Sequence, residues 1–329
     1  MIKTGTKYTK FDALVILGPT ATGKTDLAIK LAKKFNGELI SCDSRQVYKG
    51  LDIGTGKLPG GQPSVIKGNG WWEIDEVKIW LYDVVDLKKQ YTVADYVKDV
   101  NRVIDEISRR GKLPIIAGGT GLYLKALLER LSNLAIPVDL RLRKELEKLS
   151  LDELQKKLQE ISLQKWEKMN NSDRQNLRRL VRAVELNKSS SKLDSRLRGN
   201  DSLDVLKIGL MAPRRILYER INEQVVEWVK NGIVDEVKRI IREGVTKQRI
   251  KNLGLEYVVV VEYLEKKISL DQMIEKMQSK VRQYAKRQIT WFKKEKNVSW
   301  FDISNKNYVD KVENLVAKWY DIRKYAAKS

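Results

Sequence analysis

The sequence contains no histidine, and Cys42 is its single cysteine in 329 residues. A disulfide within the chain needs two cysteines and many zinc sites need imidazole, so disulfides and His-containing zinc sites are excluded. Nucleophile pairs of the Ser-His and Cys-His kinds are excluded for the same reason. Proton transfer in any catalytic site of this chain must therefore use carboxylates, lysine, tyrosine or groups of the substrate.

Long apolar runs are also absent. The longest apolar stretches, near Leu14 and Val258, are far shorter than the roughly 20 residues that span a membrane. The N-terminal segment Met1–Lys10 is polar and has no apolar signal core. We therefore expect a cytoplasmic protein that does not associate with membranes.

Acidic residues are outnumbered by basic ones. The chain has 64 Lys and Arg but 43 Asp and Glu, which gives a formal net charge of +21. Such an excess predicts an anionic partner larger than a nucleotide, most simply a nucleic acid. A long helix is predicted over Ser269–Lys294, and the segment Val281–Lys296 has six basic residues, one acidic residue and interleaved aromatics. A charge run is usually a solvated face, but the net charge of the chain favours contact with nucleic acid.

The segment Gly18–Thr25 reads Gly-Pro-Thr-Ala-Thr-Gly-Lys-Thr and fits the phosphate-loop pattern G-x-x-x-x-G-K-[ST] at every fixed position. An apolar run of strand type, Ala13–Leu17, precedes it, and Asp26–Phe35 follows with apolar residues at helical spacing. In this strand–loop–helix context the backbone N–H groups and the helix N-terminus bind an anion. Lys24 adds a positive charge and the Thr25 hydroxyl can ligate Mg²⁺. The loop is therefore predicted to bind a di- or triphosphate.

Strands and helices alternate through the first part of the chain. Strands are predicted at Glu38–Cys42, Leu81–Val85 and Leu113–Ala117, with a helix over Thr92–Gly111 that starts with a capping box. This order predicts an α/β fold, a P-loop core with a parallel sheet and crossover helices. Asp43 follows a strand, so we expect it to face the same crevice as the phosphate loop.

The character of the sequence changes after about residue 125. Residues 126–204 are charged and helical in pattern, which predicts a helical insertion domain that ends in a flexible loop at Ser189–Asp204. A core strand is expected to return at Val205–Leu210, followed by a helix over Ile216–Arg242. The expected organisation is the first part of the core at 1–125, the insertion at 126–204, and core completion with basic C-terminal helices at 205–329.

Several segments resemble those of one family, the tRNA dimethylallyltransferases, also called tRNA isopentenyltransferases. They span nearly the entire chain in the family's order and comprise Gly18–Thr25, Ser41–Tyr48 with Asp52–Thr55, Ala117–Tyr123, Arg178–Glu185 and Arg282–Trp291. The resemblance is to the bacterial type, which lacks a C-terminal zinc finger. It implies transfer of the dimethylallyl group from dimethylallyl diphosphate to N6 of adenine 37, beside the tRNA anticodon, to give N6-(dimethylallyl)adenosine. In this family the phosphate loop holds a leaving diphosphate.

The resemblance also implies roles for individual residues in a protein expected to be a monomer. Asp43 matches the general base, Thr20 lies near the bridging oxygen of the diphosphate, and Arg214 matches an arginine that contacts the diphosphate. With Mg²⁺ on Thr25, the implied diphosphate site is Gly18, Pro19, Thr20, Ala21, Thr22, Gly23, Lys24, Thr25 and Arg214. The implied tRNA site, for the anticodon stem-loop and its flipped base, is Asp43, Ser44, Arg45, Gln46, Thr120, Arg143, Arg178, Arg179, Leu180, Val181 and Arg182.

The chain departs from the family pattern in three places. A histidine that is common before the third core strand is missing, with Ile79-Trp80 near that place. Met169–Asp173 stands where the family often has a His-Pro-Asn-Asp-like turn, and Gly254-Leu255-Glu256 replaces a Gly-Tyr-Lys/Arg segment, which exchanges a basic residue for an acidic one. These departures bear on which individual RNA contacts can be assigned from the family, more than on the assignment of the reaction.

Three other functions stay open at this stage. An enzyme that prenylates free adenine nucleotides would need no helical insertion and little positive charge. A P-loop kinase would be marked by a Lys/Arg-rich lid after the core, which the sequence does not show. A non-catalytic RNA-binding protein would be favoured by replacement of Lys24, Thr25, Asp43 or Arg214, and all four are intact.

Overall fold

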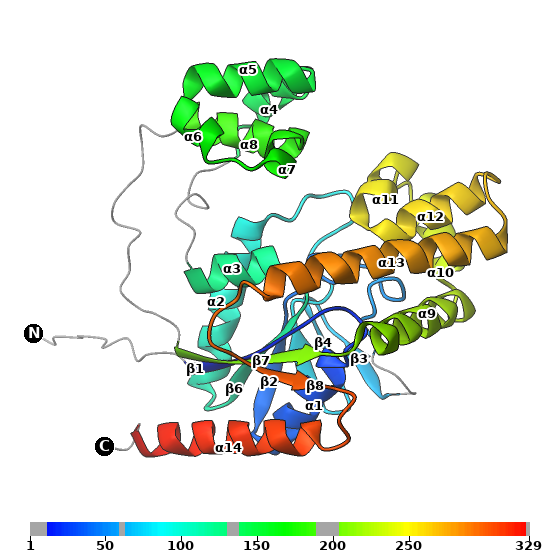
Figure 1. Cartoon of the computed structure of the whole chain (residues 1–329). Helices are drawn as coiled ribbons and strands as arrows, with labels where there is room; N and C mark the ends of the chain where they lie inside the picture. Colours follow the sequence, from blue (N-terminus) through cyan, green and yellow to red (C-terminus); the bar gives the residue numbers. More distant parts are fainter. Residues whose placement is uncertain (1–11, 59–62, 130–137, 189–203, 327–329) are drawn as a thin grey trace, which may run out of the picture. The chain divides into compact units, whose positions relative to one another are not determined.

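The computed structural model describes residues 12–58, 63–129, 138–188 and 204–326 (Figure 1). The chain divides into two compact units. We call the first, Met1–Leu128 with Ser202–Ser329, the core unit, and the second, Glu129–Asp201, the insertion unit. The flexible loop predicted at Ser189–Asp204 lies almost entirely outside the described residues.

The core unit is built on an eight-stranded sheet with the order β3-β4-β5-β2-β6-β1-β7-β8. The strands from β5 to β8 in this order pair in parallel, and β3-β4-β5 form an antiparallel edge. This confirms the predicted α/β fold. The strands are β1 (Asp12–Leu17), β2 (Gly37–Ser41), β3 (Val65–Lys67), β4 (Trp71–Ile74), β5 (Val77–Trp80), β6 (Leu113–Gly118), β7 (Asp204–Met211) and β8 (Val298–Asp302).

Helices cover both faces of this sheet, and alternate residues of β1 point to opposite faces. Leu14 and Ile16 pack with the first and last helices, whereas Ala13, Val15 and Leu17 pack with the second and third. The helices of the core unit are α1 (Lys24–Lys34), α2 (Val93–Arg109), α3 (Gly121–Glu129), α9 (Arg214–Lys230), α10 (Ile233–Arg242), α11 (Lys247–Leu253), α12 (Leu255–Leu264), α13 (Leu270–Phe292) and α14 (Tyr308–Ala326). Within the described residues, none of these or any other helix is long and apolar enough to cross a membrane.

Helix α2 begins as predicted, with the side chains and backbones of Thr92 and Asp95 bonded reciprocally in a capping box. Helix α13 begins in the same way at Ser269, with Gln272 as the reciprocal partner. Both helices therefore start at positions that local hydrogen bonding fixes.

Two predicted elements are wrong in detail. The strand expected at Leu81–Val85 is β5, four residues earlier, because Leu81 and Asp83 have φ angles of 66° and 55° and bend the chain out of the sheet. The helix expected over Ile216–Arg242 is two helices, α9 and α10. Gly232 separates them, with φ 91° in the left-handed region that glycine adopts at little cost.

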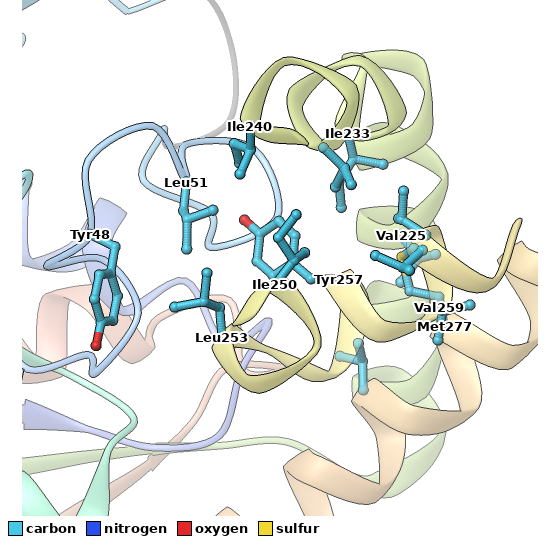
Figure 2. Close-up of a cluster of buried hydrophobic side chains, with 14 of the residues drawn as sticks. Tyr48, Leu51, Val225, Ile233, Ile240, Ile250, Leu253, Tyr257, Val259 and Met277 are labelled. Carbon is cyan, nitrogen blue, oxygen red and sulfur yellow. The ribbon is translucent and has the colours of Figure 1, made fainter. Parts of the chain in front are cut away.

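A second apolar cluster joins α9 to α13 with the segment that follows β2. Figure 2 shows Tyr48 and Leu51 of this segment facing side chains of α9 to α13, including Ile250, Leu253 and Tyr257. All five belong to one buried cluster. The chain after Asp43 is therefore packed against helices that come more than 160 residues later in the sequence.

The insertion unit has its own core. Its helices surround Leu146, Leu154, Leu158, Leu180 and Val184, each 0 or 1% exposed. The helices are α4 (Leu140–Leu146), α5 (Leu151–Ile161), α6 (Leu163–Glu167), α7 (Asn171–Arg174) and α8 (Leu177–Lys188). Within the described residues, the segment that the sequence predicts to be helical does form helices.

Candidate active site

The phosphate loop connects β1 to α1 in a conformation that its glycines allow. Gly18 has φ 148°, and a Cβ there would lie 2.4 Å from the backbone oxygen of Leu210. Gly23 has φ 75° and precedes the first residue of α1. The Lys24 Nζ donates to the Pro19 carbonyl at 2.6 Å, so the loop closes on itself around the ammonium group. Loops of this shape present backbone N–H groups to an anion.

Burial lowers the pKa of Lys24 to about 8, against a weaker opposing effect of the Asp43 carboxylate. The two side chains therefore share one electrostatic environment, although they come from the ends of different strands. Both line a cavity of about 340 Å³ at the carboxyl ends of β1, β2 and β6. The sequence predicted this meeting from the position of Asp43 after a parallel strand.

The cavity brings together most of the predicted core-unit site. Its lining includes Thr20, Ala21, Gly23, Lys24, Thr25, Asp43, Arg45 and Gln46. Ser44 and Thr120 are not among the lining residues; the backbone N–H of Ser44, next to Asp43, donates to the Thr120 Oγ1 at 3.1 Å. Gly18, Pro19 and Thr22 shape the loop behind it, and the Thr22 hydroxyl donates to the Pro19 carbonyl at 2.8 Å.

Arg214 is not among the residues that line this cavity. It is exposed at the first position of α9, whereas Arg220, six residues later, lines the cavity together with Gln224. A Cβ on Gly23 would lie 3.7 Å from the Nη2 of Arg220, so this guanidinium stands against the phosphate loop. The geometry therefore favours Arg220 over Arg214 as the arginine that reaches a bound diphosphate.

Gln288 is a site residue that the sequence did not identify as one. It is 6% exposed, and its Oε1 accepts from the Thr20 backbone N–H while its Nε2 donates to the Gly119 carbonyl, both at 2.9 Å. A polar residue within the apolar stripe of a predicted helix was the available indication. This single amide ties α13 to the phosphate loop and to the end of β6.

Gly54, Thr55 and Gly56 form one wall of the cavity, and the buried Glu236 fixes the segment that contains them. The Glu236 carboxylate accepts from the backbone N–H groups of Asp52 and Ile53 at 2.8 Å and from the Tyr257 hydroxyl at 2.9 Å. A Cβ on Gly54 would lie 2.7 Å from that hydroxyl oxygen. The segment is therefore fixed from α10 and α12, on which the sequence placed no functional residue.

Glu256, the acidic residue at a basic position of the family pattern, has a partner in the site. Both of its carboxylate oxygens accept from the Arg45 Nη1, at 2.6 and 2.7 Å. Burial lowers the pKa of Arg45, but the carboxylates of Glu256 and Asp43 outweigh this effect and raise it overall. Arg45 is therefore a fixed cation beside Asp43.

In the insertion unit, the predicted arginines are held by carboxylates. Arg143 and Arg182 donate to the buried Glu185 at 2.9 and 2.6 Å, and Arg179 pairs with Asp173. Arg178 is exposed. Leu180 and Val181 are 0% and 7% exposed in the core of this unit, so their side chains cannot make the predicted tRNA contact.

These features define the class of protein: an α/β enzyme with a phosphate loop whose anion site shares a cavity with a carboxylate. Comparisons with known proteins give the family. The family model described as IPP transferase matches residues 46–295, and the one described as isopentenyl transferase matches residues 11–62. The chain belongs to the IPP transferase family, which confirms the resemblance seen in the sequence.

Similar proteins cover nearly the whole chain. The tRNA dimethylallyltransferase 2 of Treponema denticola is 39% identical over 88% of this chain and 96% of its own length. The tRNA dimethylallyltransferase of Carboxydothermus hydrogenoformans is 38% identical over 92% and 95%.

Solved structures agree with these matches. A tRNA isopentenylpyrophosphate transferase from Bacillus halodurans is 32% identical, with TM-score 0.69 over 97% of this chain and 100% of that one. A eukaryotic dimethylallyltransferase acting on tRNA is 25% identical, with TM-score 0.76 over 95% and 80%.

Proposed function

We propose that this protein transfers the dimethylallyl group of dimethylallyl diphosphate to N6 of adenine 37, next to the tRNA anticodon. The names of the relatives support the donor and the tRNA acceptor. The observation that carries the proposal is the shared cavity, which places the Asp43 carboxylate opposite the phosphate loop residues Lys24 and Thr25.

In this reaction N6 attacks C1 of the allyl group while the bond from C1 to the diphosphate oxygen breaks. Positive charge develops on the allyl carbon and negative charge on the departing diphosphate. Lys24, the backbone N–H groups of the loop and Arg220 are positioned to stabilise that negative charge. N6 must lose a proton as its bond to carbon forms, and we assign its acceptance to Asp43, the one of the four carboxylates lining the cavity that follows β2. Thr20 lies beside the bridging oxygen in this arrangement.

Mg²⁺ fits the oxygen donors at this site. Thr25 presents a hydroxyl in the cavity beside the carboxylate of Asp26. Among the described residues there is no group of three or more Asp, Glu or Cys that could form a metal cage. That agrees with Mg²⁺, which keeps several waters and binds through few protein groups plus substrate phosphates. When bound, the ion would neutralise charge on the diphosphate, held by Thr25.

The acceptor adenine is stacked in the anticodon loop and must leave the stack to reach Asp43. Leaving the stack costs a few kcal/mol, so backbone contacts must offset it. Exposed basic side chains lie on α13 and just after its end, at Lys286, Arg287, Lys293 and Lys294, and this helix buries Gln288 against the phosphate loop. We assign the anticodon stem-loop to these side chains and to the arginines of the insertion unit.

The test is direct. Purified protein is incubated with Mg²⁺, dimethylallyl diphosphate and unmodified tRNA bearing adenine 37, and the nucleosides are analysed by mass spectrometry. A gain of one dimethylallyl group on adenosine, with none on free adenosine monophosphate, is expected. Product on the mononucleotide alone would assign the protein to the free-nucleotide class, and product on neither would contradict the proposal. We further propose, as the sequence predicts, that the protein acts in the cytoplasm and as a monomer.

A further inference from the structure

Arg45 lies between two carboxylates, and its guanidinium hydrogen-bonds to that of Glu256 but not to that of Asp43. The Glu256 carboxylate, 2% exposed, receives two short hydrogen bonds from its Nη1. The Asp43 Oδ1 lies 3.9 Å from its Nε, which is beyond hydrogen-bond distance. The same Oδ1 accepts from the Arg45 backbone N–H at 2.9 Å, so the local turn keeps the two residues together whatever the guanidinium does.

Three elements fix this arrangement. Glu256 is on α12, in the first turn of that helix, where its negative charge is also favoured by the helix dipole. The ring of Tyr284, on α13, lies 5.1 Å from the Arg45 guanidinium carbon. A Cβ on Gly254 would lie 2.6 Å from the Glu256 Oε1, so the glycine leaves room for the carboxylate to turn toward Arg45.

Without Glu256, the guanidinium would have one remaining carboxylate within 4 Å among the described residues, that of Asp43. Arginine and carboxylate groups this close form short, often bidentate, charge-assisted bonds. Such a bond would occupy the oxygen atoms that must accept the N6 proton. In the structure the Asp43 Oδ2 accepts no hydrogen bond from any described residue.

We propose that Glu256 is a positioning residue: it holds the Arg45 guanidinium away from Asp43 and so keeps the Asp43 carboxylate available to the acceptor amino group. This role rests on the proposed function, in which Asp43 takes the proton. Glu256, the acidic residue of the Gly254-Leu255-Glu256 segment, thus affects the reaction indirectly, by positioning Arg45.

The test compares Glu256→Gln with the double variant Arg45→Gln/Glu256→Gln. Transfer is measured in single turnovers with donor and tRNA saturating, and donor affinity and thermal melting report the integrity of the phosphate loop and the fold. Glu256→Gln is expected to slow transfer about tenfold or more, since it disables a general base, with donor affinity unchanged. Removing Arg45 as well is expected to restore much of the lost rate, although the KM for tRNA rises. Glu262→Gln, on the same helix and paired with Lys276, is the matched control.

A purely structural Glu256 predicts the opposite order, with the double variant no faster than the single one, and that result would overturn the inference. A wild-type rate in Glu256→Gln would overturn it too. Should Glu256→Gln not fold, Glu256→Asp takes its place in both comparisons, because its shorter side chain withdraws the carboxylate from Arg45. Absence of product with the wild-type protein refutes the proposed function, whereas an inactive Asp43→Asn beside an unaffected Glu256→Gln refutes only the positioning role.

Discussion

The side-chain amide of Gln288 accepts a hydrogen bond from the backbone N–H of Thr20 at 2.9 Å, across 268 residues of sequence. Its other end donates to the Gly119 carbonyl, where an added Cβ would lie 2.2 Å from the Nε2. Helix α13 thus holds the phosphate loop with one buried face and presents basic side chains on another. In the proposed function, this helix therefore links the donor site to the RNA-binding side chains.

We expect Gln288→Leu to weaken donor affinity, because it leaves the Thr20 N–H and the Gly119 carbonyl without their partner. The unfolding free energy should fall by about 1–3 kcal/mol, the cost of buried polar groups left unpaired. Titration with dimethylallyl diphosphate and urea unfolding measure the two effects. Gln283→Leu, at an exposed position of the same helix, is the control and should change neither. Equal donor affinity in Gln288→Leu and wild type would show that the loop keeps its shape unaided.

The two arginines of α9 make a second paired test. Arg220→Ala should lower kcat/KM for the donor by about tenfold to a hundredfold, the loss expected for one charged donor to a phosphate. Arg214→Ala, which removes an exposed side chain outside the cavity, should cost much less. Steady-state kinetics with the donor varied and tRNA saturating would decide between them. The reverse order would return the diphosphate contact to Arg214.

Asp43→Asn should abolish transfer while tRNA affinity stays within about threefold, because it removes a proton acceptor and little backbone contact. Single-turnover assays and filter binding of labelled tRNA give the two values. The amide can still accept the Arg45 N–H that Oδ1 accepts now, so the local turn should persist. Loss of tRNA binding with normal chemistry at saturation would argue against the base assignment.

Local patterns predicted the parts of the site that are local. The phosphate loop, its flanking strand and helix, and the place of Asp43 after β2 all follow from neighbouring residues and from the rule that parallel strands end at one edge. The capping box at Thr92 was likewise predicted from a short stretch, and the one found at Ser269 is formed by residues equally close in the sequence. These interactions depend on the backbone within a few residues.

The rest depends on packing between distant segments. Arg45 and Glu256 are 211 residues apart, and no short pattern indicates that α12 carries its carboxylate to the end of β2. Arg214 and Arg220 sit on one helix, and helical spacing alone does not say which faces the loop. The strand predicted at Leu81–Val85 does not form because the backbone is left-handed at Leu81 and Asp83. The residue types at these positions do not indicate that conformation.

The free energy of unfolding tests the buried network around Lys57, which lies between Gly56 and Leu58 of the cavity wall. Lys57 is 0% exposed and donates to the Asp52 and Asp83 carboxylates at 2.9 and 2.5 Å and to the Tyr48 carbonyl at 2.8 Å. Lys57→Met leaves the Asp83 carboxylate without a cationic partner and the Asp52 carboxylate with only the exposed Lys67, so we expect a loss of about 3–5 kcal/mol in urea unfolding. Lys67→Met is a close control, because Lys67 also pairs with Asp52 but is 54% exposed, and it should cost about 1 kcal/mol or less. Similar losses in both variants would contradict the buried network.

The pKa of Lys24, lowered to about 8 by burial, predicts how donor binding depends on pH. Below pH 8 the ammonium is already charged and attracts the diphosphate group of the donor, a monoester that, like a phosphate monoester with a pKa of about 6, has lost its last proton above pH 7. Above pH 8 the free protein carries neutral Lys24, and binding must take up a proton. Affinity for dimethylallyl diphosphate with Mg²⁺ should therefore fall by up to about tenfold per pH unit as pH rises above 8.

Calorimetric titration between pH 7 and 9.5 in buffers of different ionisation enthalpy measures both the affinity and the proton uptake. Lys24→Met should bind more weakly at every pH and show no such decline. Constant affinity in the wild-type protein, without proton uptake, would contradict this prediction. Lys24 would then be charged before the donor binds, with a pKa near the ordinary value for lysine.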